Sequence, residues 1–248
     1  MAGDSEDWRL IGWDRTRGAP EPIRALNKVV ERDNGEPLVD LRVVAPEVSV
    51  LRAQTIPYCR AGVAEKVRSA ACALPTGVYL GVTDAWRPYA RQVRIYEFMM
   101  RCAREAYPER SYAALRRTVC RLVAPVDQRT PPGHCTGAAL DVNLVDEEGR
   151  LVDVLSPFNR FQASRTYTLG LDPQAHANRT LLVESMEGAG FSNCRDEWWH
   201  YSYGDAGWAV RTGHRECFYG RIELDASLYA EQERLAEEAM QERPNPFL

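Results

Sequence analysis

Two short segments that lie far apart in the chain must meet in the folded protein if their side chains are to form one site. The first is GHCTGAALD at positions 133–141, and the second is EWWH at positions 197–200. The imidazoles of His134 and His200 and the carboxylate of Asp141 make a set of three zinc ligands that leaves a fourth coordination position for water. This is the arrangement of a catalytic zinc, since structural zinc sites are closed and usually rich in cysteine. Any fold of this chain therefore has to unite the two segments.

The residues between His134 and Asp141 predict how the first segment folds. Gly137 and the small residues after it let the chain turn and approach a metal closely. Apolar and polar side chains then alternate over 138–145, which predicts a strand with one face toward the core. Asp141 falls on the other face of this strand and can face a cleft.

Glu197 lies three positions before His200, close enough to act as a general base on the water at the metal. Positions three apart in a regular strand face opposite sides. Both residues therefore reach one metal only if Glu197 lies in the loop before the predicted strand 198–203 or across a bulge. Trp198 and Trp199 would provide apolar walls that keep the site dry.

Arg87 is the predicted partner of the negative charge that develops during amide hydrolysis. It follows the predicted strand 78–83, in the segment DAWRP at positions 84–88. Zinc lowers the pKa of a bound water toward about 7. Glu197 would take the proton and return it to the leaving amine, while the metal and Arg87 hold the oxyanion. The residues thus predict a zinc hydrolase.

Composition and charge exclude several partners. The chain has 248 residues, a net charge of -4 and a sequence pI of about 5.7, so no basic surplus favours nucleic acid. The first residues are acidic and polar, unlike a secretory signal, and no apolar stretch is long enough to span a membrane. We therefore expect a cytoplasmic protein. Its seven cysteines are odd in number and form no Cys-x-x-Cys pair, which predicts buried thiols rather than disulfides.

Periodicity predicts helices and strands without regular alternation, which favours an α+β class. The predicted helices cover 61–74, 90–106, 112–123, 178–187 and 227–243, with a short one near 23–32. The predicted strands cover 39–44, 78–83, 138–145 and 198–203. We expect one domain over 1–248, with an N-terminal arm at 1–38, a catalytic core at 39–222 and a C-terminal helix and tail at 223–248. Either terminus is a candidate to cover the cleft or to form a homodimer.

Together these segments resemble the D-alanyl-D-alanine dipeptidases of vancomycin resistance, a subgroup of the D-Ala-D-Ala zinc peptidase family. The family pattern is Arg-Pro, then His-x-x-Gly-x-Ala-x-Asp, then Glu-x-x-His, and this chain has it at 87–88, 134–141 and 197–200. The resemblance covers about residues 40 to 205. It implies a central antiparallel sheet flanked by helices, in the hedgehog/DD-peptidase-like fold. It also implies one Zn²⁺ per chain, with Glu197 and Arg87 in the catalytic roles given above.

Two positions depart from the family pattern near the expected substrate site. Pro132 stands where the family commonly has a serine, and it has neither a hydroxyl nor an N–H. Asn159 stands where the dipeptidases have an aspartate that meets the ammonium of the substrate, and an amide lacks that charge. Asp153 is an alternative for this role. The predicted substrate-binding residues are Pro132, Cys135, Thr136, Asn159 and Trp199, although Cys135 also fits a small packed residue.

The leading hypothesis is hydrolysis of the amide bond of a small dipeptide, with D-alanyl-D-alanine as the default substrate. One alternative is a zinc amidase that acts on another small amide without a free amine. A second is a binding module that keeps the zinc but has no turnover, although Glu197 and Arg87 argue against it.

Overall fold

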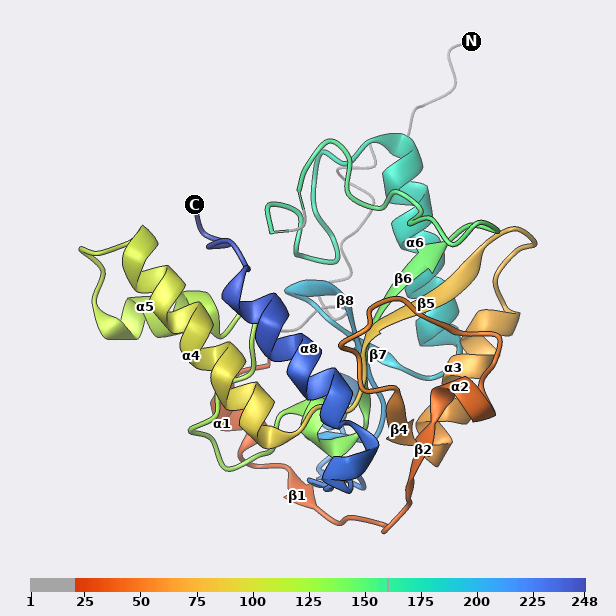
Figure 1. The fold of residues 1–248 in the computed structure, drawn as a ribbon, viewed down its shortest axis with the longest axis horizontal. Coiled ribbons are helices and arrows are strands. Elements are labelled where there is room, and N and C mark those ends of the chain that lie inside the picture. Colours follow the sequence, from red (N-terminus) through yellow and green to blue (C-terminus); the bar gives the residue numbers. More distant parts are fainter. Residues whose placement is uncertain (1–20, 160) are drawn as a thin grey trace.

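A five-stranded sheet forms the centre of the protein in the computed structural model, which describes residues 21–159 and 161–248 (Figure 1). The strand order is β3-β5-β6-β8-β7, with β3 parallel to β5 and the other pairs antiparallel. The strands are β3 (Ser49–Val50), β5 (Tyr79–Asp84), β6 (Ala139–Val145), β8 (Glu197–Ser202) and β7 (Ser192–Cys194). The predicted α+β class with a central, mainly antiparallel sheet is confirmed.

Two helices cover one face of this sheet. They are α3 (Ala61–Cys72) and α6 (Pro173–Gly188), and they lie together on one side of the strands in Figure 1. Leu140, Val142 and Leu144 of β6 are fully buried in the same apolar cluster as Val67 of α3 and Leu182 of α6. The alternation over 138–145 therefore points its apolar side chains into the main core, as predicted.

Three further helices lie on the other side: α4 (Tyr89–Ala106), α5 (Tyr112–Val119) and α8 (Ala230–Gln241). A second apolar cluster joins α4 and α5 through Met99 and Leu115, and the C-terminal residues Met240 and Phe247 pack against it. Glu233 of α8 forms ion pairs with two arginines of α4. The C-terminal helix is thus held against α4.

Short elements complete the described chain. Two small sheets pair β1 with β9 in parallel and β2 with β4 in antiparallel fashion. The short elements are α1 (Ile23–Leu26), β1 (Val30–Glu31), β2 (Leu38–Asp40), α2 (Leu41–Val44), β4 (Tyr58–Arg60), η1 (Gly133–Thr136), α7 (Ala206–Thr212), β9 (Glu216–Cys217) and η2 (Ala226–Leu228).

Most predicted elements are confirmed, with shifted ends, but two predictions were wrong in part. The strand predicted over 39–44 ends at Asp40, whose side chain accepts the N–H of Arg42 at 2.9 Å and starts helix α2. The helix predicted near 23–32 ends at Leu26, and Val30–Glu31 instead pairs with β9. That pairing joins segments far apart in the sequence, so local periodicity could not reveal it.

None of the helices in the described ranges is both long and apolar enough to cross a membrane. The division into an arm, a core and a C-terminal helix stays a prediction, and the first part of the arm, residues 1–20, lies outside the described residues.

Candidate metal centre and active site

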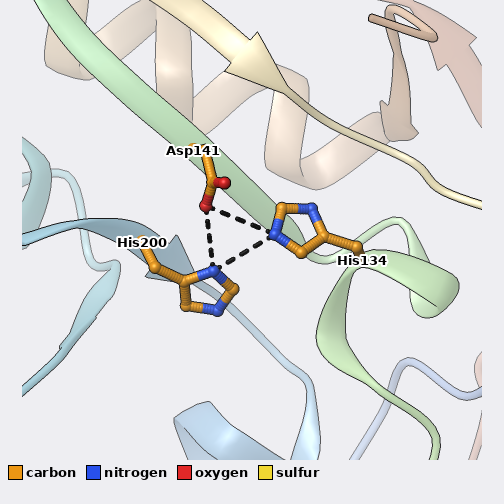
Figure 2. A group of neighbouring side chains, drawn as sticks. All are labelled: His134, Asp141 and His200. Atoms are coloured by element: carbon orange, nitrogen blue, oxygen red, sulfur yellow. Dashed lines mark hydrogen bonds and ion pairs between the residues drawn. The ribbon is translucent and has the colours of Figure 1, made fainter. Parts of the chain in front are cut away.

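Two neighbouring strands and the turn before one of them bring the three predicted ligands together (Figure 2). Asp141 of β6 is the cross-strand partner of His200 of β8, so the two side chains stand next to each other. His134 lies in the 3₁₀ turn η1, just before β6. Gly137 follows this turn with a φ of 71°, the left-handed conformation that glycine adopts readily, and leads the chain into β6.

The three ligand atoms form a nearly equilateral triangle. His134 Nε2 lies 3.2 Å from His200 Nδ1 and 3.3 Å from Asp141 Oδ1, and His200 Nδ1 lies 3.1 Å from Asp141 Oδ1. Tetrahedral ligands placed about 2.0–2.2 Å from a zinc ion are about 3.3 Å apart. The side chains therefore fit zinc in both chemistry and spacing.

The other nitrogen of His134 is also engaged. Nδ1 lies 2.7 Å from the carbonyl oxygen of Ala85, so it carries the proton and donates it. Nε2 is then free to offer its lone pair to a metal, an orientation typical of metal-binding histidines. The backbone N–H of Arg87 donates to the carbonyl of His134 at 3.1 Å. The segment that follows β5 therefore positions the first ligand.

The carboxylate of Asp141 is held in its ionised form. Burial alone would raise the pKa of Asp141, but the adjacent imidazoles of His134 and His200 outweigh burial and keep the pKa well below its ordinary value. An ionised carboxylate is the form that binds a metal.

Glu197 reaches the site because strand β8 is irregular. Its neighbour β7 pairs Asn193 with Tyr201 and the next residue, Cys194, with Glu197, so β8 has extra residues between these pairs. Glu197 Oε2 lies 3.9 Å from His200 Nδ1 as a result. Of the two expected routes, the bulge is correct, and the loop is wrong because Glu197 begins the strand.

Arg87 is buried near the ligands and held by two side chains. Its Nη2 donates to Asp84 Oδ2 and its Nη1 donates to Gln92 Oε1, each at 2.5 Å. Burial would lower the pKa of Arg87, but Asp84 and Asp141 raise it overall, so the guanidinium stays charged. Its buried Nε–H has no hydrogen-bond partner among the described residues and can donate to a ligand.

A cavity of about 630 Å³ contains these groups. Its lining includes the three ligands and Glu197, Arg87, Pro132 and Trp199. Cys135 and Thr136 are buried outside this lining. Burial raises the pKa of the Cys135 thiol to about 11, and the Thr136 hydroxyl donates to the carbonyl of Gly133. Both residues therefore shape the turn rather than face the cavity.

The structure does not bring Asn159 to the cavity. Asn159 is exposed, and its Oδ1 accepts the backbone N–H groups of Phe161 and Gln162 at 3.1 and 3.0 Å. Phe161 lines the cavity instead. The alternative, Asp153, also accepts two backbone N–H groups of its own loop.

Sequence reasoning missed the two residues that hold Arg87. The salt bridge of Asp84 could have been predicted from the sequence, because Asp84 stands three positions before Arg87 and opposite charges at this spacing often pair. Its burial beside Asp141 depends on the pairing of β5 with β6, which aligns these two aspartates. Gln92 lies one turn into α4, and nothing in the sequence marks it.

Comparison with known proteins shows which family the sequence matches. Residues 58–218 match a protein family described as D-ala-D-ala dipeptidase. A D-alanyl-D-alanine dipeptidase of Synechocystis sp. is 37% identical over 112 residues, which cover 38% of this chain and 45% of the relative. A D-alanyl-D-alanine dipeptidase of Escherichia coli is 30% identical over 135 residues, which cover 54% and 60%. The match thus spans about half the length of these curated relatives.

Two solved structures are also similar. One is a mutant of the vancomycin resistance D,D-pentapeptidase VanY in complex with Zn(II), with 17% identity and a TM-score of 0.40 over 77% of this chain and 96% of that chain. The other is VanYB in complex with D-alanine-D-alanine, with 16% identity and a TM-score of 0.41 over 75% and 93%.

Proposed function

Because the match over residues 58–218 spans well over half of the chain, this protein belongs to the D-Ala-D-Ala dipeptidase family of peptidases, and we propose that it is a zinc-dependent hydrolase of small dipeptides. D-alanyl-D-alanine is the default substrate. The observation that carries the proposal is the triangle of His134, Asp141 and His200, with Glu197 3.9 Å from one of its corners.

These side chains divide the proposed reaction between them. His134, Asp141 and His200 would hold a single zinc ion, which would polarise the amide carbonyl and lower the pKa of the attacking water. Glu197 accepts the proton of that water and passes it to the leaving amine. The charged guanidinium of Arg87 stabilises the negative charge that develops on the carbonyl oxygen.

The walls of the cavity support hydrolysis rather than binding alone. Trp199 is almost fully buried, and Pro132 adds another apolar surface beside the ligands. Apolar walls beside the ligands strengthen the electrostatic effect of Arg87 and the metal on that side of the cavity. A binding module would need neither Glu197 nor Arg87. The cytoplasmic location and the homodimer stay predictions.

Release of free alanine from D-Ala-D-Ala tests the proposal. Zinc-loaded protein should hydrolyse this dipeptide, a chelator should abolish the activity, and added zinc should restore it. N-blocked analogues in the same assay separate a dipeptidase from an amidase that needs no free amine. Failure of the zinc-loaded protein to cleave any member of a panel of D,D, L,D and D,L dipeptides and blocked analogues would refute it.

A further inference from the structure

Positively charged side chains gather around the cavity of the metal centre. Arg52 comes from the segment between β3 and β4, Arg117 from α5, Arg121 from the residues just after α5, and Arg243 from the residues after α8. All four line the cavity that contains the metal ligands. We refer to Arg52, Arg117, Arg121 and Arg243 as the arginine rim.

Nearby carboxylates do not neutralise the arginine rim. In the described part of the chain, none of its four members forms an ion pair or a hydrogen bond through its side chain. The acidic residues on the same lining interact with other partners. Three of them pair with other arginines: Glu21 with Arg211, Asp84 with Arg87 and Asp196 with Arg195. Asp141 and Glu197 lie against His200, and Asp205 accepts hydrogen bonds from Ser202 and Trp208. The rim therefore presents uncompensated positive charge to the cavity.

Arg243 lies within electrostatic range of another rim member, Arg52, and of Arg87. Arg243 is exposed, and partial desolvation together with the positive charges of Arg52 and Arg87 lowers its pKa. Its guanidinium carbon lies 5.7 Å from the centre of the Phe98 ring, which fixes one side of it. Like charges held together repel one another, and an anion placed between them relieves that repulsion.

Exposed arginines elsewhere in the described chain are of two kinds. Arg150 pairs with Asp146 and Glu148, and Arg234 pairs with Glu231 and Glu238. Arg24 and Arg104 are exposed and form no ion pair with a described residue, but neither lines the cavity. Three separate parts of the chain instead deliver arginines to one cavity without acidic partners, which is typical of a site that binds an anion.

We propose that the arginine rim binds a carboxylate that the substrate carries in addition to its terminal carboxylate, so that the protein prefers acidic dipeptides over neutral ones. Guanidinium groups suit this task because they stay charged and can donate two parallel hydrogen bonds to a carboxylate. A carboxylate is the expected anion because it is the acidic group of peptides. The inference rests on the proposed function, since it assumes a peptide in the cavity.

Matched substrates test this preference by charge alone. D-Glu-D-Ala is compared with D-Gln-D-Ala, and D-Ala-D-Glu with D-Ala-D-Gln, because each pair has nearly the same shape. We expect kcat/KM to be at least about fivefold higher for the acidic member of one pair at low salt, the effect of about 1 kcal/mol. The advantage should shrink as sodium chloride is added. Equal values within both pairs at low salt would overturn the inference.

Variants show whether the rim causes the preference. The double variants Arg52→Gln/Arg243→Gln and Arg117→Gln/Arg121→Gln remove the charge in two halves, and at least one should bring the acidic-to-neutral ratio close to one. Arg104→Gln is the matched control, because Arg104 is an exposed arginine outside the cavity lining and should leave the ratio unchanged. If both double variants keep the full ratio, the rim is not the recognition site.

Binding measurements keep the two proposals distinguishable. If no dipeptide is hydrolysed, the proposed function fails, while calorimetric titration of zinc-loaded protein with D-Glu-D-Ala and D-Gln-D-Ala still tests the rim. Tighter binding of the acidic member that is lost in a double variant supports the inference. Equal binding of the two, or no binding of either, overturns it. If neutral dipeptides are cleaved as well as acidic ones, the inference alone fails.

Discussion

Glu197 and His200 lie on the same strand, yet their proposed tasks differ, and single substitutions can separate them. Glu197→Gln keeps the shape of the side chain but removes the base, so we expect kcat to fall about 10²–10⁴-fold while zinc stays bound. Steady-state kinetics together with the zinc content of the same sample measures both effects. Normal turnover in this variant would exclude Glu197 from the mechanism.

Arg87 offers a second test among single residues. Arg87→Lys keeps a positive charge, but a lysine cannot donate to Asp84 and Gln92 at the same time as the guanidinium does, and it has no Nε–H. Because the guanidinium is proposed to stabilise the transition state, kcat should fall about 10²–10³-fold with a smaller change in KM. Arg24→Lys, on an exposed part of α1, is the control. Wild-type kcat in Arg87→Lys would contradict the proposed role.

The residues of the site differ in how far the sequence could predict them. The three proposed metal ligands could be predicted from residue type and spacing, because few side chains bind zinc, and the structure brings these three together. Asn159 was placed by resemblance in a loop, and loops are the parts of a fold that differ most between relatives. Asp84 and Gln92 act through Arg87, so their importance emerges only after the chain is folded.

Among the elements, the turn η1 depends on Gly137. A Cβ atom added there would clash with a Leu38 methyl group and lie 3.3 Å from the backbone nitrogen of Arg60, in addition to the strain of a φ of 71°. Gly149 has a similar φ of 76° but open space around it. Its substitution is therefore a control that measures the backbone strain without a steric clash. We expect Gly149→Ala to cost about 1 kcal/mol in the free energy of unfolding and Gly137→Ala to cost more and to weaken zinc binding. Urea unfolding and zinc titration measure these effects, and equal costs would contradict the packing account.

Strand β4 carries Arg60, which connects several segments to the turn η1. The buried guanidinium donates to the carbonyls of Thr136 and Gly220 and pairs with Asp33 at 2.6 Å. Burial would raise the pKa of Asp33, but hydrogen bonds from the Gly35 and Gly220 backbone and from Arg60 lower it overall. An ion pair with Asp33 in the N-terminal region therefore anchors the turn η1, which carries the proposed ligand His134.

This ion pair predicts a pH-dependent difference in stability. Because the pKa of Asp33 is lowered in the folded protein, its contribution is present above the unfolded pKa of about 3.9 and is lost as the pH falls through the folded value. Because Asp33 is partly exposed, we expect Asp33→Asn to lower the free energy of unfolding by only about 1 kcal/mol at pH 7, and the difference from wild type to shrink steadily as the pH falls below about 3.9. Urea unfolding across this pH range is the measurement. A difference that is constant with pH would show that the charge is not involved.

Elements with strong periodicity were predictable, and elements that depend on distant partners were not. The helix over 90–106 and the strand over 138–145 carry clear patterns, and both are confirmed. Strand β1 exists because it pairs with β9, and the bulge of β8 exists because of its pairing with β7. The pairing of β1 leaves no trace in the local sequence, and strand parity could predict the bulge only as one of two routes that bring Glu197 to the site.

Across the whole molecule, the main apolar core and the proposed active-site cavity lie on opposite sides of the central sheet. Helices α3 and α6 cover one face of the sheet, and α4, α5 and α8 lie on its other side (Figure 1). Residues of α4 and α5 and the chain just after α8 line the cavity. The sequence predicted the α+β class and left the C-terminal helix as a candidate either to cover the cleft or to form a homodimer. In the structure, Glu233 ties this helix to Arg91 and Arg94 of α4, and the chain beyond it brings Arg243 to the cavity.

The central claim is that one zinc ion binds between His134, Asp141 and His200. Elemental analysis of the purified, zinc-reconstituted protein after removal of free metal tests it most directly, with His200→Ala as the comparison. We predict about one zinc per chain in the wild type and a large loss in the variant. A wild-type protein without stoichiometric metal, or a His200→Ala variant with full occupancy, would contradict the claim.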